Sequence, residues 1–106
     1  MIYHAERHDG GHQSYSSSLG MAVSLDAGGL QFQDLGLIVA PNLPHEQRSF
    51  SIDVGGGSFA VLGDYLHVYF RDYLQGGDSS QFAVARAPLT TLLSNALNFQ
   101  GTPFTK

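Results

Sequence analysis

The sequence contains no cysteine, and charged side chains make up only 13% of its 106 residues. A chain without cysteine forms no disulfide bridges and has no thiolate for catalysis or metal binding. The charged fraction is about half of the roughly 25% that is typical of globular proteins. We therefore expect a fold held by its apolar core and by backbone hydrogen bonds.

Basic residues and long apolar runs are also scarce. Five Lys and Arg stand against nine Asp and Glu, which gives a net charge of −4. Nucleic-acid binding requires a basic surface, so we expect no nucleic-acid partner. No apolar run approaches the roughly 18 residues of a membrane-spanning helix, so we expect no membrane association. Residues 1–10 are polar and do not resemble a signal peptide. We expect the chain as written to be cytoplasmic, with a secreted parent family as the alternative.

What the sequence does contain is typical of β structure. It has thirteen glycines and five tyrosines, and 42% of its residues are hydrophobic, which is enough for one core. We expect a single all-β domain in which antiparallel strands form a meander. Alternating polarity predicts strands at 1–8, 19–25, 30–40, 58–62, 65–73 and 81–87, and leucine spacing predicts a short C-terminal helix at 89–97. Segments 9–18 and 41–48 are expected to be connections.

One turn carries a recognisable pattern. It resembles the Asp-box of sialidase-type propellers, with Ala27 as an extra residue, and is formed by Ser24, Asp26, Gly28, Gly29 and Phe32. The resemblance implies a structural turn, in which a carboxylate accepts backbone N–H groups and glycine adopts the left-handed conformation. The aromatic residue would hold the hairpin against its blade.

Four longer phrases are similar to five-bladed β-propeller glycosidases, the broad group that includes glycoside hydrolase families 43 and 130. They are YHAERHD (3–9), LGMAVSLD (19–26), DVGGGSFAVLGDYLHVYFRDY (53–73) and FAVARAPL (82–89). The resemblance implies that residues 1–40 supply strands two to four of a first four-stranded blade. Residues 50–98 would supply strands one to three of a second blade, followed by the helix. A propeller typically has at least four blades, so this is a fragment of one.

Incomplete blades have consequences for assembly. Their sheet edges and apolar faces would be exposed to water, and proteins normally cover such surfaces. We therefore expect a homo-oligomer, formed by blade completion or by face-to-face packing. The alternative is a small, self-contained sandwich of the six strands.

The resemblance also points to two catalytic carboxylates. Asp53 precedes the expected innermost strand, where the family places an axial acid, and Glu6 is the second carboxylate. Inverting glycosidases hold an acid and a base roughly 6.5–9.5 Å apart. The glycines at 55–57 would let a sugar approach the backbone. The alternative is that Asp53 caps a turn and that the glycines relieve crowding.

Further polar residues are expected to contact the substrate. His4 and His8 flank Glu6 on one strand face, which is also compatible with a partial metal site or with a functionless exposed face. Arg71 and Asp72 stand at a strand end, where the alternative is a local salt bridge worth under about 1 kcal/mol. We expect no metal ion and no cofactor.

The aromatic residues of the fifth strand allow two interpretations. They are expected to pack within the blade, and the alternative is a platform for sugar rings; they are Tyr65, Tyr69, Phe70 and Tyr73.

Three functions follow from these observations. The preferred one is a self-associating module that binds a glycan or another small ligand without a full catalytic site. The second is a glycoside hydrolase-like enzyme whose acid–base pair is rebuilt in an oligomer. The third is a structural or interaction protein with no retained chemistry. The sequence contains no Gly-x-Ser-x-Gly nucleophile motif, phosphate-binding loop or dinucleotide-binding motif.

Overall fold

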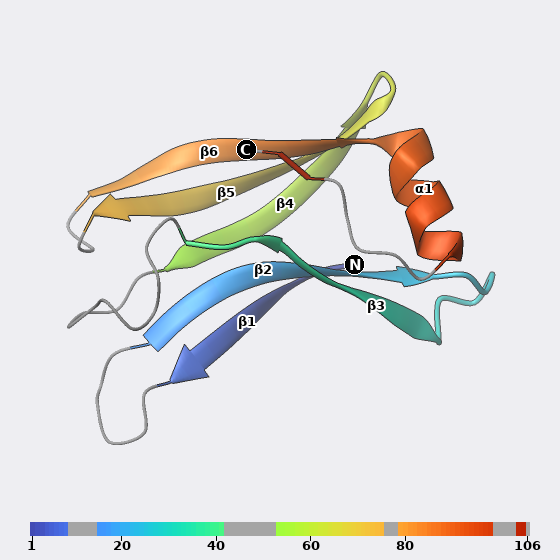
Figure 1. Cartoon of the computed structure of the whole chain (residues 1–106), viewed down its shortest axis with the longest axis horizontal. Coiled ribbons are helices and arrows are strands. Elements are labelled where there is room, and N and C mark those ends of the chain that lie inside the picture. Colours follow the sequence, from blue (N-terminus) through green and yellow to red (C-terminus); the bar gives the residue numbers. More distant parts are fainter. Residues whose placement is uncertain (9–14, 42–52, 76–78, 99–103, 106) are drawn as a thin grey trace.

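The computed structural model describes residues 1–8, 15–41, 53–75, 79–98 and 104–105, without the side chains of 73–75 and 79–80. They form β1 (Ile2–His8), β2 (Tyr15–Ser24), β3 (Phe32–Val39), β4 (Val54–Leu62), β5 (Tyr65–Gln75), β6 (Ser79–Pro88) and α1 (Leu89–Leu97). The strands make two antiparallel sheets, ordered β1-β2-β3 and β4-β5-β6 (Figure 1). The all-β prediction is confirmed. The interpretation of the sheets as propeller blades stays a prediction.

Two strands begin earlier than the sequence predicted. β2 starts at Tyr15, so the expected connection over 9–18 is wrong for its last four residues, which pair with the second half of β1. β4 starts at Val54 rather than at residue 58, because Gly56 and Gly57 take φ values of 95° and 124° and form a bulge that bends the strand without ending it. Residues 42–48 of the second expected connection lie outside the described residues.

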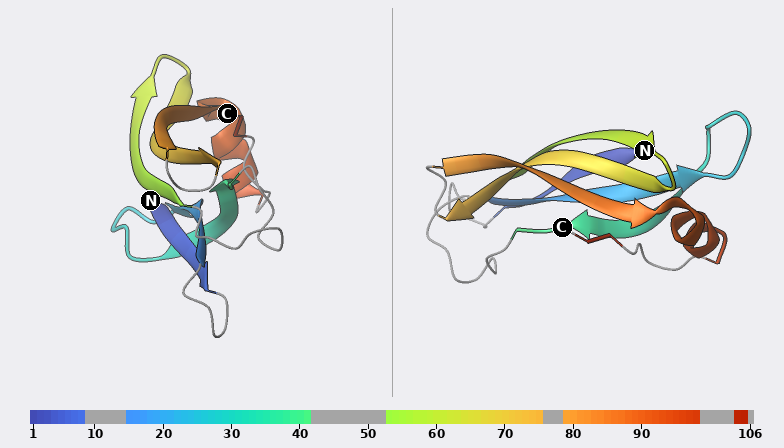
Figure 2. Two further views of the ribbon diagram at one scale, coloured as in Figure 1. Left: turned by 90° about the vertical axis from the view of Figure 1, so that its left-hand side faces the viewer. Right: turned by 90° about the horizontal axis from the view of Figure 1, so that it is seen from above.

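The two sheets stack on each other and share an apolar core (Figure 2). Its buried members come from both sheets and are Leu19, Val39, Val54, Val68, Phe70 and Ala85. Burying a side chain such as Leu, Val or Phe contributes about 1.5–3 kcal/mol, so this shared core is what joins the sheets. Gly57 permits their close approach, because a Cβ there would lie 3.1 Å from Ile2 Cγ2.

The helix covers one end of the space between the sheets (Figure 1). Its buried residues, Leu92 and Ala96, join a second apolar cluster with Met21, Leu35 and Leu66. α1 is nine residues long, and none of the helices in the described ranges has the length and apolar character needed to cross a membrane.

The β2–β3 turn follows the predicted mechanism. The carboxylate of Asp26 accepts the hydroxyl of Ser24 and the backbone N–H groups of Leu30 and Gln31, the last two at 3.3 and 3.2 Å. Gly29 takes a φ of 63°. The hydrogen bond from Ser24, followed by those from the two N–H groups, lowers the pKa of Asp26 to about 2. Phe32 is 48% exposed, and the role expected of it, to hold the hairpin against its blade, stays a prediction.

Candidate functional site

A row of polar side chains lies at the end of the molecule opposite α1. It comprises His4, Glu6 and His8 of β1 and Asp53, which directly precedes β4; we call it the polar row. Alternate residues of a strand share a face, so the three β1 residues follow Ile2, which packs against the core. The inner face of β1 thus changes from apolar to polar toward His8.

Side-chain contacts connect the row from one sheet to the other. His4 Nε2 lies 3.3 Å from Asp53 Oδ1, and His4 Nδ1 lies 3.6 Å from Glu6 Oε1. Glu6 Oε2 lies 2.9 Å from His8 Nε2. The contact of His4 with Asp53 is a hydrogen bond, whereas its contact with Glu6 is longer than a hydrogen bond. The side chains remain accessible, with exposed fractions from 27% for Asp53 to 66% for His8.

Ser17 of β2 fixes the carboxylate of Asp53. Its hydroxyl accepts the backbone N–H of Val54 at 2.7 Å and donates to Asp53 Oδ1 at 2.5 Å. Ser17 is 1% exposed and bonds to the carboxylate rather than to a histidine, so it is a positioning residue and not an activated nucleophile. Ser17 was not predicted as a site residue, because residues 9–18 read as a connection. It shares a strand face with Tyr15 and Leu19, but three consecutive serines at 16–18 give no apolar alternation that would indicate this.

An aromatic ring stands beside the row. The rings of His8 and Tyr15 are 5.6 Å apart between centroids and are inclined by 32°. The two residues are cross-strand partners of β1 and β2, which explains their proximity. The row therefore combines hydrogen-bonding groups with a flat apolar surface.

Arg71 and Asp72 lie on opposite faces of the second sheet. Neighbouring residues of a strand point to opposite faces. Asp72 is buried, at 3% exposure, and pairs across β4–β5 with Val54, the residue that follows Asp53. Arg71 is exposed and pairs with Gly55. Asp72 thus lies on the inner face near the polar row, and Arg71 lies on the outer face.

The alternative of a metal site gains no support from this geometry. Within the described ranges, no three His, Asp or Glu side chains are arranged to hold a metal ion. His8 and Glu6 are joined by a hydrogen bond at 2.9 Å, and Glu6 and His4 by a longer ion-pair contact at 3.6 Å.

The outer face of the second sheet is rich in exposed aromatic residues. This aromatic face consists of Tyr65, His67, Tyr69, Phe82, Val84 and Arg86. The ring centroids of Tyr65 and His67 are 6.2 Å apart, those of His67 and Tyr69 are 6.4 Å apart, and Arg86 lies 4.9 Å above the Tyr65 ring.

The aromatic residues were expected to pack within the blade, and of those whose side chains are described Phe70 is the one that lies in the core. Phe70 is 2% exposed, whereas Tyr65 and Tyr69 are 37% and 43% exposed. The difference arises because Phe70 points to the first sheet and the two tyrosines point away from it. The side chain of Tyr73 lies outside the described residues.

Four of the six predicted site residues therefore meet in the polar row, Asp72 lies near it, and Arg71 lies on the aromatic-face side. Comparison of the chain with protein-family models, curated proteins and solved structures finds no match.

Proposed function

We propose that this chain is a carbohydrate-binding module that self-associates and lacks a complete catalytic site of its own. The observation that carries the proposal is the pair of contacts from His4 to Asp53 and Glu6, which joins both sheets into one exposed row. Sugar hydroxyls both donate and accept hydrogen bonds, and carboxylates and imidazoles offer both roles. The ring of Tyr15 adds an apolar surface for the C–H face of a sugar ring.

The affinity that we expect of a single polar row for a sugar is low. A hydrogen bond to a charged group contributes about 1.5–3 kcal/mol, and part of that is offset by the entropy lost on binding. A millimolar dissociation constant corresponds to a net free energy of about 4 kcal/mol, so several such bonds are needed to reach it. Several rows in one assembly would raise the overall affinity through multivalency. Self-association is therefore part of the proposed function.

The aromatic face supports this second part of the proposal. Phe82 is 89% exposed, and Val84 and Tyr69 beside it are each 43% exposed. Contiguous exposed apolar surface of this kind marks interaction sites in proteins. A second copy of the chain, packed on this face as one blade packs on the next, would cover it.

Sugar binding is tested by NMR titration with a panel of monosaccharides and disaccharides. We expect amide shifts at Glu6 and at the start of β4, with saturation in the millimolar range. Asp53→Asn removes one charged acceptor and should weaken binding by about tenfold or more, in line with 1.5–3 kcal/mol. Glu6→Gln should act in the same direction.

The matched control is Asp64→Asn, which removes an equal charge in the exposed β4–β5 turn. It should leave the affinity unchanged. The proposal is wrong if no sugar shifts these amides, or if Asp53→Asn and Asp64→Asn bind sugar as the unmodified chain does.

A hydrolase-like activity in the oligomer is the second candidate. It is favoured by one observation, that Glu6 and Asp53 contact opposite nitrogens of the same imidazole and so form a carboxyl pair. Hydrolysis of aryl-glycosides that is abolished by Asp53→Asn would establish it. Sugar binding without hydrolysis would support the binding module. No response in either assay would support a structural protein without retained chemistry.

A further inference from the structure

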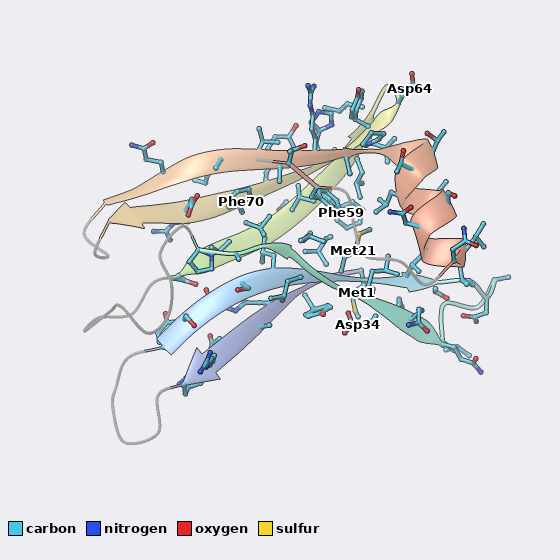
Figure 3. The ribbon with its side chains drawn as sticks, viewed as in Figure 1. Met1, Met21, Asp34, Phe59, Asp64 and Phe70 are labelled. Carbon is cyan, nitrogen blue, oxygen red and sulfur yellow. The ribbon has the colours of Figure 1, made fainter. Side chains whose placement is uncertain are left out.

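A separate cavity lies between the sheets at the α1 end of the molecule. Its volume is about 180 Å³, and all eleven of the described residues that line it are apolar. Every described strand except β6 contributes to its wall, and α1 covers it. Figure 3 shows Met21 and Phe59, from the two sheets, directed into this region. We call it the helix-side cavity.

The helix-side cavity has a buried floor and a rim that solvent reaches. Met21, Leu35 and Leu66 form the floor and are 8%, 7% and 5% exposed. Phe59 and Leu93 form part of the rim and are 56% and 51% exposed. A molecule can therefore reach the floor past apolar side chains.

The cover of this cavity is one short helix. α1 follows Pro88, which forms no side-chain cap, and it has no acidic residue in its first turn and no basic residue in its last. Its ends are held by hydrogen bonds from the Leu89 N–H to Asp64 O at 2.8 Å and from Asn98 Nδ2 to Ser94 O at 2.9 Å. Isolated helices shorter than about 12–15 residues are marginal in water, so packing must hold this one. That packing consists of Leu92 and Ala96, which lie against the floor residues Met21, Leu35 and Leu66. The position of α1 is thus coupled to what the cavity contains.

We infer that the helix-side cavity binds a neutral, compact apolar molecule, such as an aromatic ring or a short alkyl chain. A cavity of about 150 Å³ lined by Leu, Ile and Phe in another protein stays dry and binds benzene. The present cavity is larger and equally apolar. Among the described lining residues the one charged group is the Met1 ammonium, which already donates to Ala22 O at 2.8 Å. A charged ligand is therefore disfavoured, because burying a charge without a partner costs several kcal/mol. This inference is independent of the carbohydrate proposal.

The test uses toluene and n-hexane as probes and benzoate as the charged analogue. We expect either neutral probe to raise the melting temperature in a saturable way and to shift the methyl signals of Met21, Leu35 and Leu92. Hydrogen exchange of the α1 amides should slow at the same time. Benzoate should do none of these things. A response to only one neutral probe would decide between an aromatic and an alkyl ligand.

Two helix variants locate the binding. Leu93→Asn changes the cavity rim and should weaken toluene binding several-fold. Leu97→Asn changes an exposed residue of the same helix that does not line the cavity and should leave binding unchanged. Ala96→Leu fills the cavity and should abolish the response.

Three outcomes would overturn the inference. They are the absence of any thermal or NMR response to both neutral probes, equal effects of Leu93→Asn and Leu97→Asn, and methyl shifts confined to the aromatic face. If Ala96→Leu does not fold, the comparison of the two asparagine variants still decides.

Discussion

Asp26 organises the β2–β3 turn through its charged form. Its folded pKa of about 2 lies below the ordinary value of 3.8, because Ser24 and two backbone N–H groups donate to the carboxylate. A lowered folded pKa means that the charged carboxylate stabilises the fold above about pH 3.8, and that this contribution is lost as the pH falls toward 2.

We therefore expect Asp26→Asn to lower the melting temperature at neutral pH and to have little effect near pH 2. Thermal unfolding followed by circular dichroism at both pH values measures this. Asp64→Asn in the β4–β5 turn is the control for loss of one negative charge. An equal effect of Asp26→Asn at both pH values would show that the carboxylate does not act through its charge.

Gly20 of β2 lies beneath the ring of its cross-strand partner Tyr3. A Cβ on Gly20 would be 2.1 Å from Tyr3 Cζ, so no other residue fits without displacing the ring. The hydroxyl of Tyr3 donates to Asp34 at 2.7 Å, which raises the pKa of Tyr3 and lowers that of Asp34.

Gly20→Ala should displace the Tyr3 ring and break its hydrogen bond to Asp34, and so reduce the free energy of unfolding by about 0.5–1.5 kcal/mol, the usual net contribution of one hydrogen bond. Urea unfolding measures the change. The same substitution in a Tyr3→Ala background should cost much less, because the ring is gone. A cost that is independent of Tyr3 would contradict this explanation.

At the scale of elements, α1 lacks a side-chain cap at its N-terminus. Pro88 at its N-cap offers no side-chain acceptor, and the first turn carries no negative charge. Pro88→Asp would supply both and should stabilise the protein by about 0.5–1 kcal/mol. The unfolding free energy and the exchange rates of the α1 amides measure the effect. Pro88→Ala is the control, and an equal gain from it would exclude capping as the cause.

The elements themselves were largely predictable from local patterns. Strand alternation and turn glycines located all six strands and the leucine spacing located α1, because these signals depend only on neighbouring residues. The start of β2 was missed because residues 16–18 are serines, which carry no apolar alternation. Gly56 and Gly57 were read as a break, because whether glycine ends or bends a strand depends on the neighbouring strand. Here Gly56 pairs with Phe70 of β5 and Ser58 with Tyr69, and Gly57 is the extra residue between them.

The site was predictable only in part, for a physical reason. Alternation placed His4, Glu6 and His8 on one face. Their link to Asp53 depends on the packing of one sheet on the other, across 49 residues of sequence between His4 and Asp53. The helix-side cavity depends on where α1 folds back, which no local pattern specifies.

At the scale of the whole molecule, polar and apolar surfaces are segregated. The polar row lies at one end, the helix-side cavity at the other, and the aromatic face covers the outside of the second sheet. The outer face of the second sheet is therefore an apolar surface that a single copy does not cover in the described residues. The proposed function requires that a second copy covers it.

Phe82→Gln should weaken such an assembly, because Phe82 is the most exposed residue of the aromatic face. Leu30→Gln is the matched control, since Leu30 is 86% exposed but lies in the β2–β3 turn, away from that face. Sedimentation equilibrium of both variants measures the change in the association constant. Equal association of the two variants would place the contact elsewhere, at a sheet edge.

The most direct measurement is the solution mass of the unmodified chain at low micromolar concentration, by sedimentation velocity or light scattering. A second copy that covers the aromatic face should give a measured mass of at least twice the monomer mass of 11.4 kDa. A stable, folded monomer at that concentration would contradict it.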